Sequence, residues 1–541
     1  MPLEHPRSHP PALLRAALRV LQFGGSAVVL AALPYPLFEL DRYTFPKELI
    51  LEVVAVWAGL LCLASARRIT VLAADVLLGA FLLVSLISVL TAANGWLAFR
   101  AIGVSLAGAA VFWCGRAIGR TELRDALLGA IAAAVVLGAL TALAQAYGVV
   151  TTNLASLTRA PGGTFGNRNF MAHLVTIGSP VLLLVCLEAK GRVRFAAGAL
   201  GVVLVAAALV LSRSRAAWLG AGVCGAFLAV EGLWIGRLWT DDRLRRRVVL
   251  LAGAVGLGLA LALGLPNKLN WRSESPYFDS LAGVANFREG SGRGRLVQYG
   301  NTLGMVADHA LLGVGPGNWP VYYPRYRSPA DPSFDGGDIL PTNPWPSSDW
   351  IAVLAERGLV ALLLLMLLGG SIALGAWARI RHGSRAAPAL PDLAIAATLL
   401  AVAVVGAFDA VLLLPIPAFF VWTTIGALAS TARPVREIPL TSGSRRQLLI
   451  GAGIIGTLFL FRSTAQTAAM GLYSTGNRGA MELASRLDPG SYRIHMLLGL
   501  TWMESGRCDR ARPHGVRARE LFPNHPAPHQ ILRVCGSGKR N

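Results

Sequence analysis

Residues 349–377 read DWIAVLAERGLVALLLLMLLGGSIALGAW, and most of this stretch is apolar. A helix of about 20 residues crosses the ~30 Å hydrocarbon layer of a bilayer, because each helical residue adds about 1.5 Å. The stretch is therefore predicted to span a membrane. Similar runs recur along the chain, which is 54% hydrophobic and 15% charged. Soluble domains carry about 25% charged residues, so a single soluble core is not expected.

The apolar runs of the whole chain predict a polytopic membrane protein. The thirteen predicted spans lie at 16–36, 47–65, 71–92, 98–118, 123–147, 168–187, 194–211, 216–236, 247–265, 349–377, 391–411, 415–431 and 447–461. Pro415 and Pro417 are expected to interrupt the start of the twelfth. The predicted fold class is all-α, with about 12–13 transmembrane helices, one large periplasmic loop and a short helical-repeat tail.

Arginine-rich clusters predict the orientation of these spans. The clusters follow every even-numbered span, at 67–68, 116–124, 190–194, 237–247, 379–385 and 433–446. Basic residues collect in the cytoplasmic loops of membrane proteins. The N-terminus, residues 1–15, is therefore expected in the cytoplasm, and an odd number of spans sends the C-terminal tail to the periplasm. Because the net charge of +21 resides in these clusters, no nucleic-acid partner is expected.

The predicted domains follow from the spans. Residues 16–265 hold the first nine spans and 347–461 the last four, with a large periplasmic loop, 266–346, between them. This loop is rich in glycine and proline and holds five of the ten tyrosines. A long segment that does not span the membrane is more often functional than passive. Its aromatic rings could stack on sugars or anchor the loop at the interface, and composition alone favours anchoring.

The tail, residues 462–541, has the pattern of a tetratricopeptide repeat. Pro489 and Pro523 each close a similar tripeptide, 34 residues apart, and Ala484 and Ala518 repeat at the same spacing. One repeat is well matched and a second is implied, whereas about three are normally needed for independent stability. The tail is therefore expected to lean on the membrane domain or on a protein partner.

The cysteines divide into two groups. Cys508 and Cys535 are the only ones outside the predicted spans, and the predicted topology places both in an oxidising compartment. We therefore predict a disulfide between them. The others are expected to be small apolar fillers within spans, at Cys62, Cys114, Cys186 and Cys224. The sequence has no CxxC, HExxH or Walker motif, so neither a metal nor a cofactor is expected.

Six arginines near span ends or in the loop are predicted to face outward, against the usual charge bias. They are Arg159, Arg168, Arg213, Arg215, Arg293 and Arg295. A guanidinium fork binds phosphate oxygens with two parallel hydrogen bonds. The cluster therefore suits an anionic lipid head group such as a pyrophosphate. The alternative is that each arginine snorkels to the interface or forms an ion pair.

Four segments resemble the O-antigen ligase family of bacterial membrane glycosyltransferases, which includes O-antigen polymerases and protein O-oligosaccharyltransferases. They are GTFGNRN at 163–169, SRSRAAW at 212–218, a stretch from Arg295 to DHALLGVGPGN at 308–318, and SSDW at 347–350 with ERG at 356–358. Together with the topology, the resemblance covers roughly residues 16–430 and leaves out the repeat tail. Tyr299 stands where the family usually has tryptophan.

The resemblance implies an activity and a site. A glycan would move from an undecaprenyl-pyrophosphate carrier to an acceptor hydroxyl on lipid A core, on another glycan or on a protein. The reaction would take place at the outer face of the bacterial inner membrane, as in lipopolysaccharide biosynthesis. Essential arginines are implied at Arg215 and, in the loop, at Arg295, where they would stabilise charge developing on the pyrophosphate. The candidates for substrate binding are Arg159, Arg168, Asn169, Arg213, Arg293 and Glu356.

Two alternatives remain open. Within the family, the protein could be an O-antigen polymerase or a protein O-oligosaccharyltransferase, and the tail favours a protein acceptor or partner. In another class, it could be a non-catalytic membrane scaffold or a polysaccharide transporter. A transporter would be expected to have inverted repeats and interrupted helices at matching places in two halves. The sequence has no such internal symmetry.

One departure from the family concerns proton transfer. The family usually has histidine eleven residues before the glycine that corresponds to Gly358, and this chain has Ser347 there. Serine cannot replace histidine as a base at neutral pH. Asp349, our catalytic candidate, could take over, as could His309 or Glu356; leaving-group stabilisation could suffice, or activity could be lost. Asp349 is also a plausible N-cap of its helix, and Glu356 could pair with an arginine.

Overall fold

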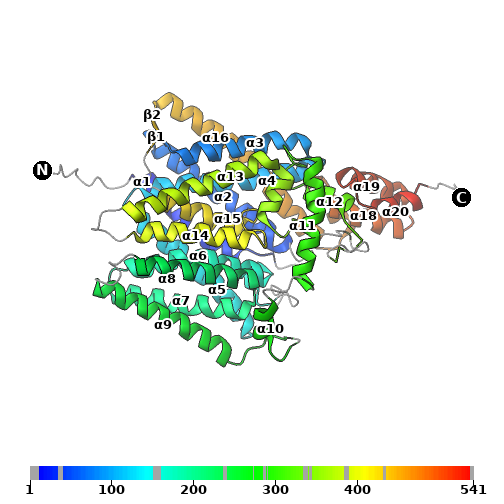
Figure 1. Cartoon of the computed structure of the whole chain (residues 1–541). Coiled ribbons are helices and arrows are strands. Elements are labelled where there is room, and N and C mark those ends of the chain that lie inside the picture. The colour runs from blue at the N-terminus through cyan, green and yellow to red at the C-terminus, as the bar shows by residue number, and fades with distance from the viewer. Residues whose placement is uncertain are drawn as a thin grey trace.

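The computed structural model describes residues 11–33, 41–149, 160–234, 241–271, 273–283, 288, 290–329, 331–332, 339, 344–382, 389–429 and 434–536. Long helices form the body of the molecule, with a smaller helical unit at one end (Figure 1). Each predicted span corresponds to a helix, which confirms the all-α polytopic class. These helices are α1 (Ala12–Leu30), α2 (Asp41–Ser65), α3 (Ala73–Ile87), α4 (Gly95–Gly119), α5 (Arg124–Ala146), α6 (Arg168–Glu188), α7 (Arg192–Ser212), α8 (Arg215–Trp234), α9 (Asp242–Gly264), α13 (Asp349–His382), α14 (Leu390–Gly406), α15 (Pro415–Leu428) and α16 (Ser442–Tyr473). Among the described residues, ten helices are long and apolar enough to cross a bilayer, and α14 and α15 are shorter apolar helices.

Two span ends differ from the prediction. The prolines of the twelfth span do not interrupt a helix, because α15 begins at Pro415, where the backbone N–H needs no intrahelical partner. The last span extends well past the predicted end at 461, since α16 continues to Tyr473. Arg462 ends the apolar run in the sequence, but its guanidinium lies 3.1 Å from the Glu52 carboxylate of α2. This pairing neutralises the charge inside the bundle, so the helix continues.

Small residues let α4 and α15 pack at close range. A Cβ at Gly119 would overlap the backbone of Ala427, and one at Gly426 would overlap the backbone of Phe112. Membrane helices associate through such close backbone approach, because lipid offers no hydrophobic drive between them. The α4–α15 contact therefore forms a rigid centre for the bundle.

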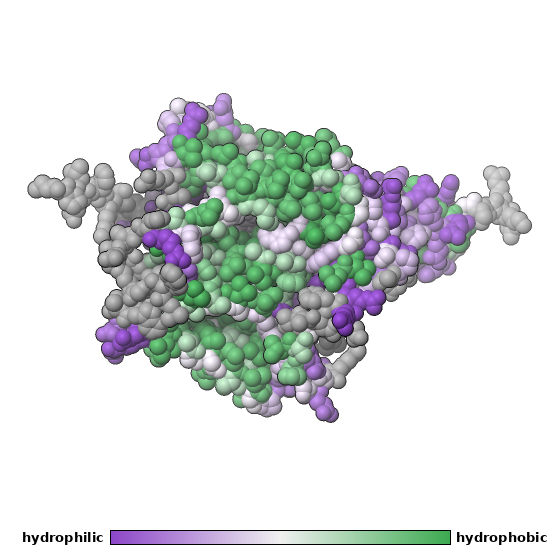
Figure 2. Space-filling model, in the orientation of Figure 1, coloured by the Kyte–Doolittle hydropathy of each residue, from purple (hydrophilic) through white to green (hydrophobic). Residues whose placement is uncertain are grey.

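The two ends of the bundle carry different segments. The short strands β1 (Arg68–Val71) and β2 (Arg436–Pro439) pair antiparallel at the end from which the chain emerges at its N-terminus (Figure 1). The loop helices and the C-terminal unit lie at the opposite end, which we call the loop end. Figure 2 shows a hydrophobic surface over the bundle, with hydrophilic residues concentrated toward its ends. The large loop and the tail thus share one end, while their location in the periplasm stays a prediction.

The loop and the tail both contain helices. The loop contains α10 (Pro276–Ala282), α11 (Gly290–Asp308) and α12 (Trp319–Tyr326), and the tail contains α17 (Arg478–Leu487), α18 (Tyr492–Glu504), α19 (Cys508–Leu521) and α20 (Pro528–Val534). Two short 3₁₀ helices, η1 (Ser88–Thr91) and η2 (Gly163–Phe165), join longer elements. Whether the tail is a tetratricopeptide array stays a prediction.

The tail leans on the membrane domain, as expected. Arg493 of α18 forms an ion pair with Asp41 at the start of α2. A Cβ at Gly490 would overlap the side chain of Trp96 on α4, so the turn before α18 lies directly against that helix. The Asn524 side chain also donates a hydrogen bond to the Val321 carbonyl of α12 at 3.0 Å. The tail therefore shares contacts with both the bundle and the loop.

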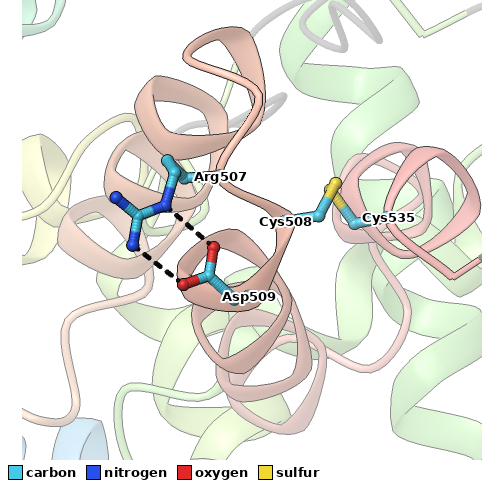
Figure 3. The surroundings of a disulfide bond; sticks show 4 residues. All are labelled: Arg507, Cys508, Asp509 and Cys535. Atoms are coloured by element: carbon cyan, nitrogen blue, oxygen red, sulfur yellow. Dashed lines mark hydrogen bonds and ion pairs between the residues drawn. A yellow bond between two sulfur atoms is a disulfide. The ribbon is translucent and has the colours of Figure 1, made fainter. Parts of the chain in front are cut away.

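The predicted disulfide is confirmed. Cys508 and Cys535 are bonded, with their Cα atoms 5.0 Å apart. Figure 3 shows the bond joining the start of α19 to the end of the last described tail helix, beside the Arg507–Asp509 ion pair of 3.0 Å. The cross-link holds α20 against α19, at the end of the helical tail.

Candidate active site

The SRSRAAW motif forms the tight turn between α7 and α8. Arg213 is in the left-handed region with a φ of 52°, and α8 begins at Arg215. Between them, the buried Ser214 donates its N–H to the hydroxyl of Ser212 at 3.2 Å. The serines thus hold the turn, and both arginines leave it at the loop end of the bundle.

Trp271, just after α9, collects two of the predicted arginines. The guanidinium carbon of Arg213 lies 4.6 Å from the centre of the indole ring, and that of Arg168 lies 5.3 Å from it. Arg213 also donates through Nε to the Ser280 hydroxyl of α10 at 2.8 Å. Cations are attracted to the negative face of an aromatic ring. The indole therefore brings together an arginine from the start of α6 and one from the turn between α7 and α8.

The two motif arginines are also neighbours. Arg215 donates to the Gly283 carbonyl after α10, and its charge interacts with that of Arg295 on α11. The Nε of Arg295 is buried, and within the described part of the chain it has no hydrogen-bond partner. Buried donors are nearly always paired, so this one is poised for an acceptor.

The structure does not place the other predicted binding residues in this group of arginines. Arg293 is exposed, and as a neighbour two positions from Arg295 on the same helix it faces another direction. Asn169 donates its backbone N–H to the side chain of Asn167, the N-cap of α6, at 3.0 Å. Arg159 lies outside the described residues.

The electrostatics of this cluster favour an anion. α6 begins at Arg168 and α8 at Arg215, so two long helices direct their positive N-terminal dipoles toward the loop end. Unpaired backbone N–H groups at such ends bind phosphate oxygens. Asp279 of α10 is the acidic group that interacts with Arg213. We call Arg168, Arg213, Arg215 and Arg295 the arginine cluster.

α11 fixes the position where the family has its histidine. The Gln298 side chain accepts a hydrogen bond from the Ser347 N–H at 2.8 Å, and the Tyr299 hydroxyl contacts the Ser347 carbonyl. The same hydroxyl lies 2.9 Å from the carbonyl of Ala407. Burial raises the pKa of Tyr299 to about 12, so the hydroxyl stays a donor at neutral pH. The tyrosine thus joins α11, the start of α13 and the end of α14.

Asp349 is held by backbone groups of another connection. Its Oδ2 accepts hydrogen bonds from the N–H groups of Val411 and Leu412, both at 2.9 Å, and Asp349 is fully buried. The helix-capping contact comes instead from Ser348, whose hydroxyl lies 3.5 Å from the Ile351 N–H. The Asp349 carboxylate therefore orders the segment that leads into α15.

Glu356 has a similar place in the glycine-rich loop before α12. Its carboxylate accepts the N–H groups of Gly317 at 2.8 Å and Trp319 at 3.3 Å, and the side chain is buried. The next residue but one, Gly358, has a φ of 81°, and a Cβ there would overlap the carbonyl of Leu311. Only glycine permits that approach without strain. The two motifs therefore lock α13 to the loop.

Comparison with known proteins identifies this arrangement. Residues 200–366 match the family model described as O-antigen ligase. The chain therefore contains an O-antigen ligase domain at these residues. The matched ligase domain runs from α7 into α13 and includes Arg213, Arg215, Arg295, Asp349 and Glu356. Its family members are glycosyltransferase-type enzymes that act on lipid-linked glycans in membranes. No curated protein matches the chain.

Beside the matched ligase domain, the structure brings together two residues that sequence reasoning missed. His173 of α6 is fully buried, and its Nε2 lies 4.0 Å from an oxygen of Asp409, in the turn after α14. Neither ring nitrogen of His173 has a hydrogen-bond partner among the residues that the structure describes. Its ring also interacts electrostatically with Arg295. A sequence signal existed, because ionisable residues inside predicted spans are rare and often functional.

A cavity of about 510 Å³ opens between the membrane helices and the tail. Its wall includes aromatic residues of α4 and of the loop, among them Trp96, Phe99 and Trp345. Several of its charged groups form ion pairs; the Glu48 carboxylate, for example, accepts hydrogen bonds from two nitrogens of Arg100 at 2.7 to 2.9 Å. The cavity therefore offers aromatic faces and polar groups without a large excess of charge.

Proposed function

We propose that the protein transfers a glycan from an undecaprenyl-pyrophosphate carrier to an acceptor hydroxyl at the outer face of the inner membrane. The observation that carries the proposal is the arginine cluster at the loop end of the bundle. In this reaction the bond between the sugar and the pyrophosphate breaks, and negative charge develops on the departing phosphate. Arginines and helix N-termini aimed at that oxygen stabilise the charge in the transition state.

The arrangement of the cluster supports a pyrophosphate in particular. Arg215 and Arg295 come from different elements and interact electrostatically, so a ligand with two phosphate groups can contact both. Arg168 and Arg213 both lie against the indole ring of Trp271 and add positive charge. The apolar chain of the carrier would remain in the bilayer, next to the helices whose loop end holds the head group.

We place the acceptor in the cavity between the bundle and the tail, which Trp345 lines. The cavity meets the requirements of a sugar, since aromatic faces pack on sugar rings and paired charges offer hydrogen bonds. Loss of transfer in Trp345→Ala, with unchanged binding of undecaprenyl pyrophosphate, supports this placement. Unchanged transfer removes it.

Deletion of the gene tests the function. Cells without the protein are expected to accumulate the carrier-linked glycan in their membranes, and one surface molecule is expected to lose that glycan. Thin-layer chromatography of lipid extracts and blotting of surface glycans measure the two effects. An unchanged carrier pool together with unchanged surface glycans contradicts the proposal.

The same experiment separates the related activities. A lipid A core without its glycan indicates a ligase, shortened glycans indicate a polymerase, and an unmodified protein indicates a protein O-oligosaccharyltransferase. Arg493 and Tyr492 of the docked tail line the cavity, and this position of the tail favours a protein acceptor. If the protein is a scaffold or a transporter, its deletion lowers glycan export, but substitution of Arg215 or Arg295 does not lower glycan transfer itself.

A further inference from the structure

We propose that His173, oriented by Asp409, takes the proton from the acceptor hydroxyl and replaces the histidine that the family has at position 347. The inference deepens the proposed function and rests on it. Ser347 has no group that can accept a proton at neutral pH, so a glycosyltransferase of this type needs a base from elsewhere in the fold.

The first observation is the state of the imidazole. His173 is fully buried on α6, and both of its ring nitrogens lack a hydrogen-bond partner within the described ranges. Nearly all buried polar groups are hydrogen-bonded, and an exception calls for a functional or structural explanation. Two unpaired ring nitrogens inside a helix bundle therefore point to a substrate group that pairs with the imidazole when it is bound.

The second observation is its position relative to Ser347. The Tyr299 hydroxyl bridges the carbonyls of Ser347 and Ala407, and Asp409 follows two residues after Ala407. The carboxylate of Asp409 lies 4.0 Å from His173 Nε2. The imidazole thus belongs to the same cluster of residues as position 347, although it comes from a different helix.

The third observation is the charge around the ring. Asp409 uses Oδ1 to accept its neighbour's N–H, that of Ala410, at 2.9 Å, which leaves Oδ2 toward His173 Nε2. The other charged group that interacts with the ring is Arg295. A bound pyrophosphate neutralises Arg295, while Asp409 stabilises the imidazolium. In acyl-transfer enzymes a carboxylate that is hydrogen-bonded to a histidine base stabilises its imidazolium, and Asp409 offers the same type of partner at 4.0 Å.

The step balances as follows. His173 Nδ1 accepts the proton of the acceptor hydroxyl as the oxygen forms a bond to the anomeric carbon of the donor sugar. The bond from that carbon to the phosphate oxygen breaks, and its electron pair leaves with undecaprenyl pyrophosphate beside Arg215 and Arg295. The proton on His173 then passes to solvent, and the enzyme returns to its starting state.

Aromatic rings connect the acceptor cavity to this base. Trp345 lines the cavity, its ring centre lies 6.1 Å from that of Phe170, and Phe170 lies 6.5 Å from His173. Leu412 and Leu413 of the segment after Asp409 also line the cavity. In this proposal the acceptor hydroxyl reaches His173 by passing Trp345 and Phe170.

The test measures transfer and donor binding separately in the full-length protein. His173→Gln is expected to lower glycan transfer by about 100-fold or more, the usual contribution of a general base. Binding of undecaprenyl pyrophosphate to the purified protein is expected to stay unchanged, because the arginine cluster is intact. His529→Gln is the matched control and should leave transfer unchanged, since His529 is an exposed histidine on α20 of the tail.

A rescue variant separates chemistry from folding. Adding Ser347→His to His173→Ala is expected to restore much of the transfer, because it returns an imidazole to the family position. A packing defect on α6 would not be repaired from the start of α13. Wild-type transfer by His173→Gln overturns the inference, as does loss of donor binding in His173→Gln with no rescue by Ser347→His. If the wild-type protein itself transfers no carrier-linked glycan, the proposed function is what fails, and this inference fails with it.

Discussion

Glu52 of α2 and Arg462 of α16 form a buried ion pair, with 3.1 Å between a carboxylate oxygen and a guanidinium nitrogen. The adjacent Ser463 donates its hydroxyl to the same carboxylate at 2.6 Å. Glu48 lies 3.9 Å from the guanidinium, so the charges form a small network. This network fastens the helix that carries the tail to the rest of the bundle.

Breaking the pair should therefore destabilise the protein. Arg462→Met leaves Glu52 buried without its cation, and we expect a loss of about 3 to 5 kcal/mol in the free energy of unfolding. Thermal unfolding in detergent measures the change. Arg510→Ala is the control, because its pair with Glu482 is largely exposed and should contribute less than about 1 kcal/mol. Equal effects of the two variants would contradict the assigned role.

Lysine should not replace the motif arginines. Arg215→Lys and Arg295→Lys keep the charge but lose the fork that binds two phosphate oxygens. Each is expected to lower glycan transfer tenfold or more, about 1.4 kcal/mol in the barrier, with normal amounts of protein in the membrane. Arg325→Lys is the control, since Arg325 is an exposed arginine on α12 of the same loop. Normal transfer by both lysine variants would remove the reason for placing the pyrophosphate there.

Asp349→Asn should affect stability more than chemistry. The carboxylate accepts backbone N–H groups with both oxygens, those of Val411 and Leu412 at Oδ2 and that of Leu413 at Oδ1, whereas an amide has a single acceptor oxygen. We expect a loss of about 1 to 3 kcal/mol in unfolding free energy. Transfer per folded molecule should be largely kept, and Ser347→Ala should have little effect on either measurement. Loss of transfer with unchanged stability would instead show that Asp349 takes part in the reaction.

Removal of the Cys508–Cys535 disulfide should loosen the tail. The bond closes a segment with a sequence separation of 27 residues. In the chain-entropy model a loop of this size is worth about 3 kcal/mol. Cys508→Ser with Cys535→Ser is expected to speed proteolysis within the tail, while the bundle keeps its thermal stability. Free thiols at both positions in the native protein, detected by mass spectrometry, would contradict the bond.

Reporter fusions test the orientation. Fusions near residues 310 and 480 are expected to be active only with a periplasmic reporter, and one near 240 only with a cytoplasmic reporter. The structure places the large loop and the tail at the same end of the bundle, so the first two must agree. Cytoplasmic activity at 310 would overturn the predicted topology.

The helices and the disulfide were determined by the sequence itself, because each depends on residues that lie close together or on simple exclusion. An apolar run forms a spanning helix wherever it stands in the chain, since the bilayer leaves backbone groups no other partner. The predicted end of the last span at residue 461 is wrong because it depends on a distant contact. Glu52, which neutralises Arg462, lies far away in the sequence, and only helix packing brings the two together. Cys508 and Cys535 could be paired because the other cysteines lie in apolar runs.

The site depended on tertiary structure to a greater degree. The motif arginines could be named from the sequence, but the indole of Trp271 that collects Arg168 and Arg213 could not. The sequence allowed Asp349 to be a catalytic acid or a helix cap. In the structure its carboxylate accepts hydrogen bonds from the backbone of the segment before α15. His173 and Asp409 meet only because α6 packs beside α14, and no local pattern encodes which helices become neighbours. The sequence determines the chemistry of each side chain, whereas the packing of the helices decides which ionisable groups become partners.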